Sequence, residues 1–141
     1  MTDFEVTDSL KPDDIAAIKS GIAEAHIGKG GLAYDPHVLG VFARDERGRL
    51  IAGLHGQTSW DWLYIDELWV TDTRRGHGLG AQLMQEAEKE ARKRGCHSVY
   101  LFTQSYGVPG FYQKLGYQKF VTLADCPRGH EQQGFMKRLA A

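Results

Sequence analysis

Three glycines at alternate positions, Gly76, Gly78 and Gly80, follow two arginines and form the stretch of this sequence best suited to chemistry. A glycine turn lets a phosphate approach the backbone without meeting a Cβ atom. If a helix starts there, its first N–H groups have no partner within the helix, and the helix dipole adds partial positive charge. Arg75 adds a fixed charge and a fork of donors. The stretch is therefore predicted to bind a ligand that carries phosphate.

The flanking sequence supplies the strand and the helix that such a site needs. Residues 64–70 are a largely apolar run typical of a strand. After the glycines, apolar residues recur at helical spacing up to Arg94, and Gly95 is a natural stop. The charged residues of this helix, Glu88 among them, are predicted to form a solvated face with i,i+4 pairs.

Three phosphate sites use glycine turns of this kind. A P-loop requires a Gly-Lys-Ser/Thr ending, which is missing. A dinucleotide fingerprint is matched by Gly76, Gly78 and Ala81, but the turn lies in mid-chain and no acidic residue ends the next strand. The coenzyme A motif Gln/Arg-x-x-Gly-x-Gly/Ala is matched at every fixed position, from Arg75 to Gly80. At this point the sequence resembles the GNAT superfamily of N-acetyltransferases.

A second motif strengthens the resemblance. Residues 110–117 read Gly-Phe-Tyr-Gln-Lys-Leu-Gly-Tyr and look like the closing signature of the family, an aromatic–tyrosine pair followed by a Lys-Leu-Gly-aromatic turn. The separation of this signature from the glycine turn is also what the family shows. The resemblance covers residues 51 to about 120, and both ends of the chain match less well.

The resemblance implies which residues hold acetyl-CoA, the expected cosubstrate. In the family, the pantetheine arm lies between two parallel strands and pairs with one of them, here through the backbone of Leu68, Trp69 and Val70. The pyrophosphate would lie against the backbone amides of Arg75, Gly76, His77, Gly78, Leu79, Gly80 and Ala81. Many members have an asparagine seven residues before the signature tyrosine that contacts pantetheine. Ser105 stands there instead, so this contact is expected to be replaced or lost.

Acyl transfer from a thioester to an amine needs a neutral amine, a stabilised oxyanion and a proton for the leaving thiolate. By resemblance, Tyr112 lies near the sulfur of the coenzyme. A phenol is ordinarily protonated at neutral pH and can donate, so Tyr112 is the expected general acid. The alternative is a packing role beside Phe111 and Tyr117. Cys96 and Cys126 have no nearby base in the sequence and are not expected to act as nucleophiles.

Glu67 is the expected base, acting directly or through a water molecule, because several relatives use a carboxylate just before the residues that pair with pantetheine. The alternative is a solvated or ion-paired carboxylate. Asp66 would face the other side of a regular strand, and a β-bulge would change that assignment. His26, His37 and His55 lack supporting spacing as bases, and His55 fits a hydrogen-bonded structural histidine.

The remaining elements follow from apolar periodicity and turn residues. Strands are predicted at residues 4–7, 38–43, 50–58, 63–71, 98–103, 117–122 and 134–139, and helices from residue 13 or 14 onward, at 79–94 and at 108–115. Strands joined by short links must be antiparallel, whereas the helix at 79–94 is a crossover that makes 98–103 parallel to 63–71. The predicted fold is a mixed α/β (α+β), GNAT-like sheet, mostly antiparallel with one central parallel strand pair, flanked by helices.

The amino-acid composition limits the classes of partner that the sequence suggests. Lysine and arginine number 17, aspartate and glutamate 18, and the net charge of −1 indicates neither a nucleic-acid nor an anionic-membrane partner. The sequence has no signal-peptide pattern, no membrane-spanning apolar stretch and no histidine or cysteine spacing for a metal. A single cytoplasmic acetyltransferase domain over residues 1–141 is expected, without a metal. Homodimers are common in the family, and a homodimer stays open as an alternative that this sequence does not decide.

The combined prediction is an acetyl-CoA-dependent N-acetyltransferase that moves an acetyl group to a primary amine by direct attack in a ternary complex. A small-molecule amine is favoured, because no charge pattern marks a peptide groove. The alternatives are a non-catalytic acyl-CoA sensor, a protein or peptide N-acetyltransferase, and an NAD-binding protein that would rest on G-x-G-x-x-A alone. Acceptor specificity is expected in three segments outside the shared motifs, residues 26–35, 60–62 and 124–133. The first of these is either a substrate lid or a connecting loop.

Overall fold

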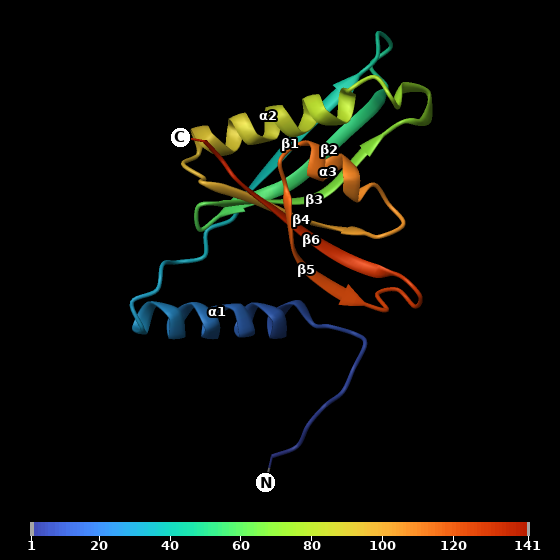
Figure 1. Cartoon of the computed structure of the whole chain (residues 1–141). Coiled ribbons are helices and arrows are strands. Elements are labelled where there is room, and N and C mark those ends of the chain that lie inside the picture. The colour runs from blue at the N-terminus through green and yellow to red at the C-terminus, as the bar shows by residue number, and fades with distance from the viewer. Residues whose placement is uncertain (1, 141) are drawn as a thin grey trace. The chain divides into compact units, whose positions relative to one another are not determined.

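Figure 1 shows the computed structural model of the chain, which describes residues 2–140. The chain divides into two compact units, Met1–Asp35 and Pro36–Ala141. Each unit is described by itself. The second unit contains the glycine turn, Tyr112 and Glu67.

The first unit contains one helix, α1 (Pro12–Gly28). Proline at the first helical position and acidic residues at 13 and 14 favour a helix start, because proline has the required φ angle and negative charge suits the positive end of the dipole. The predicted strand at residues 4–7 was wrong: these residues are irregular, and Phe4 and Val6 are almost fully exposed. The predicted loop at 26–35 is also shorter, since α1 continues through Gly28.

The second unit is built on a six-stranded sheet in the order β1-β2-β3-β4-β6-β5. All neighbouring strands are antiparallel except β3 and β4, which are parallel, as the sequence predicted. The strands are β1 (His37–Arg44), β2 (Leu50–Ser59), β3 (Trp62–Val70), β4 (Ser98–Gln104), β5 (Gln118–Ala124) and β6 (Glu131–Arg138). Because β5 reaches Ala124 and β6 begins at Glu131, the excursion predicted at 124–133 shrinks to residues 125–130.

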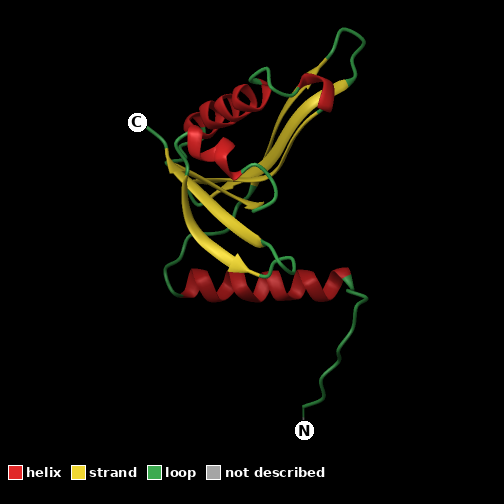
Figure 2. Ribbon diagram, turned by 45° about the vertical axis from the view of Figure 1, so that its right-hand side comes forward, coloured by secondary structure: helices red, strands yellow, loops and turns green. Residues whose placement is uncertain are grey.

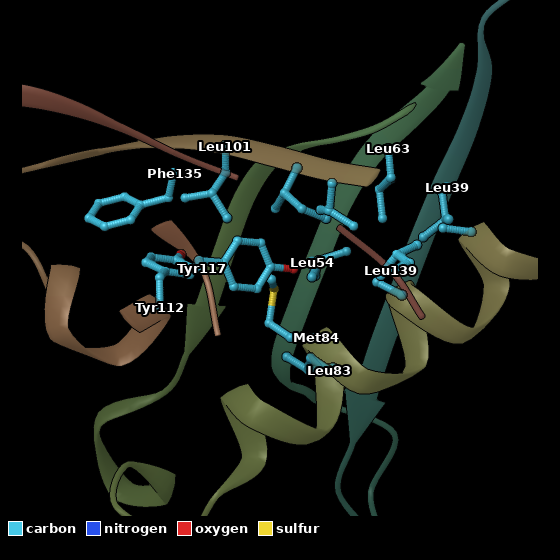
Figure 3. Close-up of a cluster of buried hydrophobic side chains, with 14 of the residues drawn as sticks. Leu39, Leu54, Leu63, Leu83, Met84, Leu101, Tyr112, Tyr117, Phe135 and Leu139 are labelled. Atoms are coloured by element: carbon cyan, nitrogen blue, oxygen red, sulfur yellow. The ribbon is translucent and has the colours of Figure 1, made fainter. Parts of the chain in front are cut away.

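Two helices, α2 (Leu79–Lys93) and α3 (Pro109–Lys114), cover one face of this sheet (Figure 2). The apolar stripe of α2 supplies Leu83, Met84, Ala87 and Ala91, which are buried against the sheet. In Figure 3, Tyr112 from α3 and Met84 from α2 lie on the same side of the strands that carry Leu101 and Phe135. One core therefore fixes α2 and α3 relative to the two parallel strands.

The parallel pair separates partway along its length. Pairing between β3 and β4 runs from Trp62 opposite Ser98 to Ile65 opposite Leu101 and stops there. Beyond that point β3 still pairs with β2 as far as Val70, and β4 still pairs with β6 as far as Gln104. The facing edges of β3 and β4 are thus unpaired toward their carboxyl ends, where ligands of α/β sheets commonly bind.

A β-bulge in β3 lies where this separation begins. The two-residue turn between β2 and β3 sets Ser59 opposite Trp62, yet His55 lies opposite Glu67 and Gly56 opposite Ile65. Asp66 is therefore the extra residue of the bulge. A Cβ atom on Gly56 would collide with the carbonyl oxygen of Tyr64, so the strand opposite the bulge needs glycine at this position.

Candidate functional site

A cavity of about 680 Å³ opens beside the separated part of β3. Its walls come from three segments that are far apart in the sequence: the end of β3, the glycine turn with the start of α2, and α3. The lining residues are Leu68, Trp69, Val70, Arg74, Arg75, Gly76, Gly78, Leu79, Gly80, Ala81, Val108, Phe111, Tyr112, Lys114 and Leu115. The cavity thus brings together Tyr112 and nine of the residues predicted to hold a coenzyme. His77 and Ser105 lie outside this lining.

The glycines of the turn serve two different physical purposes. Gly76 and Gly78 have φ angles of 82° and 79°, which side chains rarely adopt, and a Cβ on either would meet no protein atom within 4 Å. They therefore bend the chain and leave open space in front of the backbone. Gly80 allows close packing against α3, because a Cβ there would lie 3.2 Å from Cζ of Phe111 and that ring would have to shift slightly.

The turn ends in the exposed donors of a helix. Gly78 is the N-cap of α2 and carries no side chain to cap the helix. The first helical bond in this region runs from the N–H of Gln82 to the carbonyl of Gly78. The preceding N–H groups, those of Leu79, Gly80 and Ala81, belong to the first turn and have no acceptor within the helix. They carry the partial positive charge that binds anions at helix N-termini.

Arg75 is held across the turn. Its Nε donates to the carbonyl oxygen of Val70 at 3.1 Å, and its Nη1 lies 2.9 Å from Oδ1 of Asp72. The side chain therefore ties the end of β3 to the turn while its charge stays at the cavity. Arg74 and Lys114 also line the cavity, and together these three cations make it attractive to an anion.

Tyr112 combines a buried ring with an unengaged hydroxyl. Its side chain is 7% exposed and contacts the rings of Phe111, Tyr117 and Phe135 at centroid distances of 5.0, 6.1 and 6.1 Å. Burial raises the pKa of Tyr112, so the phenol stays protonated at neutral pH. Among residues 2–140 no hydrogen bond engages its hydroxyl. The residue thus packs in the core and also lines the cavity.

Tyr117, in the same core, differs from Tyr112 because its hydroxyl makes a hydrogen bond. Its hydroxyl donates to Oε2 of Glu88 at 2.7 Å, and Nζ of Lys137 donates to Oε1 of the same carboxylate at 3.0 Å. Glu88 is 5% exposed, so the solvated position predicted for it was wrong. The helical spacing could not reveal this, since the partners come from β6 and from the segment after α3. Burial and the Glu88 carboxylate both raise the pKa of Tyr117.

Glu67 lies one residue before the cavity wall and outside the lining. Its side chain is 77% exposed, and Oε1 lies 2.8 Å from Nε2 of His55, which is 50% exposed. Asp66 is exposed as well, because the bulge interrupts the alternation that would have placed the two carboxylates on opposite faces. The histidine partner was missed, since its register with Glu67 depends on that bulge.

Ser105 is bound to the neighbouring strand. Its Oγ accepts the N–H of Glu131 at 2.9 Å, and its own N–H donates to the carbonyl of Glu131 at 2.8 Å. Within residues 2–140 no group of three histidine, cysteine, aspartate or glutamate side chains is placed to hold a metal ion. The helices of this described range also include none with the length and apolarity needed to cross a membrane.

Comparisons with known proteins agree with this geometry. The model of the acetyltransferase (GNAT) family matches residues 6–117, a range that includes the glycine turn, Glu67 and Tyr112. Blasticidin-S acetyltransferase of Streptomyces morookaense is 40% identical over 103 residues, which are 72% of this chain and 76% of that protein. The crystal structure of an acetyltransferase from Bacillus cereus ATCC 14579 superposes with a TM-score of 0.83 at 29% identity, covering 96% of this chain and 98% of that one. An aminoglycoside 6'-N-acetyltransferase, solved in complex with coenzyme A, shares the fold with a TM-score of 0.67 at 21% identity, over 74% of each chain.

Proposed function

This chain belongs to the GNAT family of acetyltransferases, and we propose that it transfers the acetyl group of acetyl-CoA to a primary amine of a small molecule. The observation that carries the proposal is that one cavity is lined both by a helix N-terminus suited to anions and by Tyr112, whose phenol is protonated at neutral pH. A dinucleotide would explain the glycine turn but would leave Tyr112 and the separated strands without a role.

The residues around the cavity fit the parts of acetyl-CoA. The free N–H groups at the start of α2 and the cations Arg74, Arg75 and Lys114 suit the phosphates. The unpaired edge of β3 from Leu68 to Val70 suits the amides of the pantetheine arm, which would add to the sheet as an extra strand does. Bound in this way, acetyl-CoA supplies an activated acetyl group as a thioester.

Tyr112 is the proposed general acid. In the reaction the amine nitrogen attacks the thioester carbonyl, an N–C bond forms, and the C–S bond breaks. The sulfur leaves as a thiolate, and the phenolic proton of Tyr112 neutralises it. The proton that the attacking nitrogen loses returns to the phenolate through water, so the products are the neutral amide and free coenzyme A thiol. Because burial keeps that phenol protonated, the proton is available at neutral pH.

Glu67 is the proposed carboxylate on which deprotonation of the amine depends. Most primary amines are ammonium ions at neutral pH and must lose a proton before they can attack. Glu67 stands at the point where β3 and β4 separate, one residue before the cavity wall. With the exposed Asp66 beside it, this edge carries two carboxylates that attract a cationic acceptor.

A small-molecule amine is the proposed acceptor class. The relative that is 40% identical is named for blasticidin S, and a structural neighbour is named for aminoglycosides. Blasticidin S is therefore the first acceptor to test, followed by a panel of amines that includes peptides with a free N-terminus or a lysine side chain. Acetylation of the peptides alone would replace the small-molecule proposal by the protein-acceptor alternative.

Calorimetric titration with acetyl-CoA, with NAD as the comparison ligand, tests the coenzyme site. The variant Gly78→Asp places a side chain and a negative charge in front of the helix N-terminus, so binding should fall at least about 100-fold. Gly48→Asp is the matched control, because Gly48 has a φ of 78°, equally open surroundings and a place in the β1–β2 turn. Release of free coenzyme A thiol with an amine then reports turnover.

Each result of these experiments tests a different part of the proposal. Acetyl-CoA binding that survives in Gly48→Asp and is lost in Gly78→Asp supports the site. Binding without thiol release for any amine in the panel would favour the acyl-CoA sensor. Failure of the folded wild type to bind acetyl-CoA would remove the proposal.

A further inference from the structure

The contact between His55 and Glu67 fixes the position of one proton. Nε2 of His55 and Oε1 of Glu67 are 2.8 Å apart, a distance at which a hydrogen atom lies between the two. A carboxylate is ordinarily ionised at neutral pH and can only accept, so the neutral imidazole carries its proton on Nε2. The lone pair of His55 is then on Nδ1, and this nitrogen is the one able to take up a proton.

The pair stands on the face of the sheet opposite α2. Leu54 and Leu68, which are neighbours of the pair in the same two strands, pack into the core beneath the helices. Side chains alternate along a strand, so His55 and Glu67 point to the other face. Glu67 therefore lies on the part of β3 that has separated from β4, and His55 lies beside it on β2, both on the face of the sheet opposite α2. An acceptor amine could approach there while the coenzyme is held from the helix side.

The β-bulge decides which carboxylate His55 meets. Continued without interruption from the two-residue turn, the register would place His55 opposite Asp66, but the extra residue brings Glu67 into that position. On β1 the residue opposite His55 is Gly40, which has no side chain and no charge. Glu67 is the titratable group that contacts the imidazole, and Asp66 lies next to Glu67 in the bulge, close enough to Tyr64 to raise the pKa of that phenol.

A contribution to folding stability does not explain why His55 and Glu67 form a pair. With side chains 50% and 77% exposed, His55 and Glu67 are well hydrated, and ion pairs of this kind add little to folding. The same exposure suits a group that must exchange protons with water in every cycle.

We propose that His55 and Glu67 form the proton-accepting pair for the acceptor amine, an inference that rests on the proposed acetyltransferase function. Nδ1 of His55 receives the proton. One N–H bond of the ammonium ion breaks, an N–H bond forms at Nδ1, and the electron pair left on the amine is free to attack. Glu67 holds the Nε2–H and stabilises the imidazolium ion by its negative charge. The imidazolium then returns the proton to water.

The protonation state can be measured on the full chain before any acceptor is known. Nitrogen-15 NMR of the histidine rings, with the His55 signals assigned by their loss in His55→Gln, should show the neutral tautomer with hydrogen on Nε2. Glu67→Gln should change that tautomer population, whereas Asp66→Asn, which removes a charge one residue away, should leave it unchanged. A neutral ring with hydrogen on Nδ1, or a ring unaffected by Glu67→Gln, would overturn the pairing.

The pH dependence of kcat/KM for the amine tests the catalytic part. A His55 ring that is already protonated cannot take up the proton of the amine, so kcat/KM of the wild type should have an acidic limb, on which activity falls as the pH is lowered. In His55→Ala, kcat/KM should fall at least about 10-fold and the acidic limb should disappear, while the KM for acetyl-CoA stays unchanged. Added imidazole should restore part of the activity. Glu67→Gln should move the limb to lower pH, whereas Glu46→Gln, at an exposed carboxylate in the turn between β1 and β2, should behave like wild type.

The outcomes separate this inference from the proposed function. His55→Ala with the wild-type rate and pH profile would overturn the pair and leave the acetyltransferase proposal intact. A lower rate with an unchanged profile and no rescue by imidazole would assign His55 a structural role and also overturn the pair. A wild type that binds acetyl-CoA but turns over no amine would overturn both proposals.

Discussion

Tyr112 and Tyr117 are buried in the same core, with their ring centroids 6.1 Å apart. The two residues differ in the hydrogen bonding of their hydroxyl groups. Tyr117 donates to Glu88 and is thereby committed to the fold. Tyr112 has a similar apolar environment, has no such acceptor within the described residues 2–140, and lines the cavity. At the scale of the residue, the proposed role of Tyr112 depends on a hydrogen bond that is not made.

Replacement of each tyrosine by phenylalanine should separate the two roles. Tyr112→Phe keeps the ring contacts and removes only the proton donor, so kcat should fall about 100-fold or more while the KM for acetyl-CoA and the free energy of unfolding stay near wild type. Tyr117→Phe leaves the buried Glu88 carboxylate one donor short, so the free energy of unfolding should fall by about 1–3 kcal/mol while kcat is retained.

Steady-state kinetics and urea unfolding of the two variants check this pair of expectations. Full activity in Tyr112→Phe would show that solvent protonates the thiolate. A loss of kcat in Tyr117→Phe as large as that in Tyr112→Phe would mean that the second hydroxyl also takes part in the reaction.

At the scale of the element, the bulge in β3 connects the fold to the site. It lies where β3 and β4 stop pairing, it adds Asp66 to the exposed edge, and it brings Glu67 opposite His55. Its counterpart on β2 is Gly56, whose Cα lies so close to β3 that a Cβ would collide with the carbonyl oxygen of Tyr64. Backbone atoms cannot move aside as the end of a flexible side chain can.

Gly56→Ala should therefore destabilise the second unit and disturb the site together. We expect the free energy of unfolding to fall by at least about 2 kcal/mol, since the added methyl group forces the backbone of the two strands apart. Gly110→Ala is the control: Gly110 is helical, and a Cβ there meets nothing within 4 Å. Urea unfolding measures the difference, and equal stability of Gly56→Ala and wild type would contradict this role of the bulge.

The elements that sequence reasoning predicted well are those whose cause is local. The glycine turn and the start of α2 follow from residue types within a few positions, and the parallel pair follows from the length of the crossover. The bulge, the His55–Glu67 contact and the burial of Glu88 depend on which segments meet in three dimensions, and no short window of the sequence contains both partners. The strand expected at residues 4–7 has an alternating pattern, but pattern alone does not form a strand without a partner.

At the scale of the whole molecule, several titratable groups of the second unit are neutral when protonated, and their pKa values are all raised. Burial raises the pKa values of Tyr112 and Cys96, and burial together with nearby negative charge raises those of Tyr64 and Tyr117. A raised pKa in the folded state means that the unfolded chain releases its proton at a lower pH than the folded chain does. High pH therefore destabilises the folded state, and the contribution of Tyr117 to this loss is the largest.

The stability of the protein should therefore begin to fall above the unfolded-state pKa of the Cys96 thiol near 9. It should fall more steeply above the unfolded-state tyrosine pKa near 10, until the higher folded-state pKa is reached. Tyr117 alone contributes a slope of about 1.4 kcal/mol per pH unit in that window. Urea unfolding at intervals from pH 7 to 11 measures the curve. Tyr117→Phe starts from a lower plateau, because its hydrogen bond to Glu88 is lost, yet above pH 10 its curve should fall less steeply than that of wild type. Parallel curves would mean that the Tyr117 hydroxyl is not the group whose ionisation opens the core.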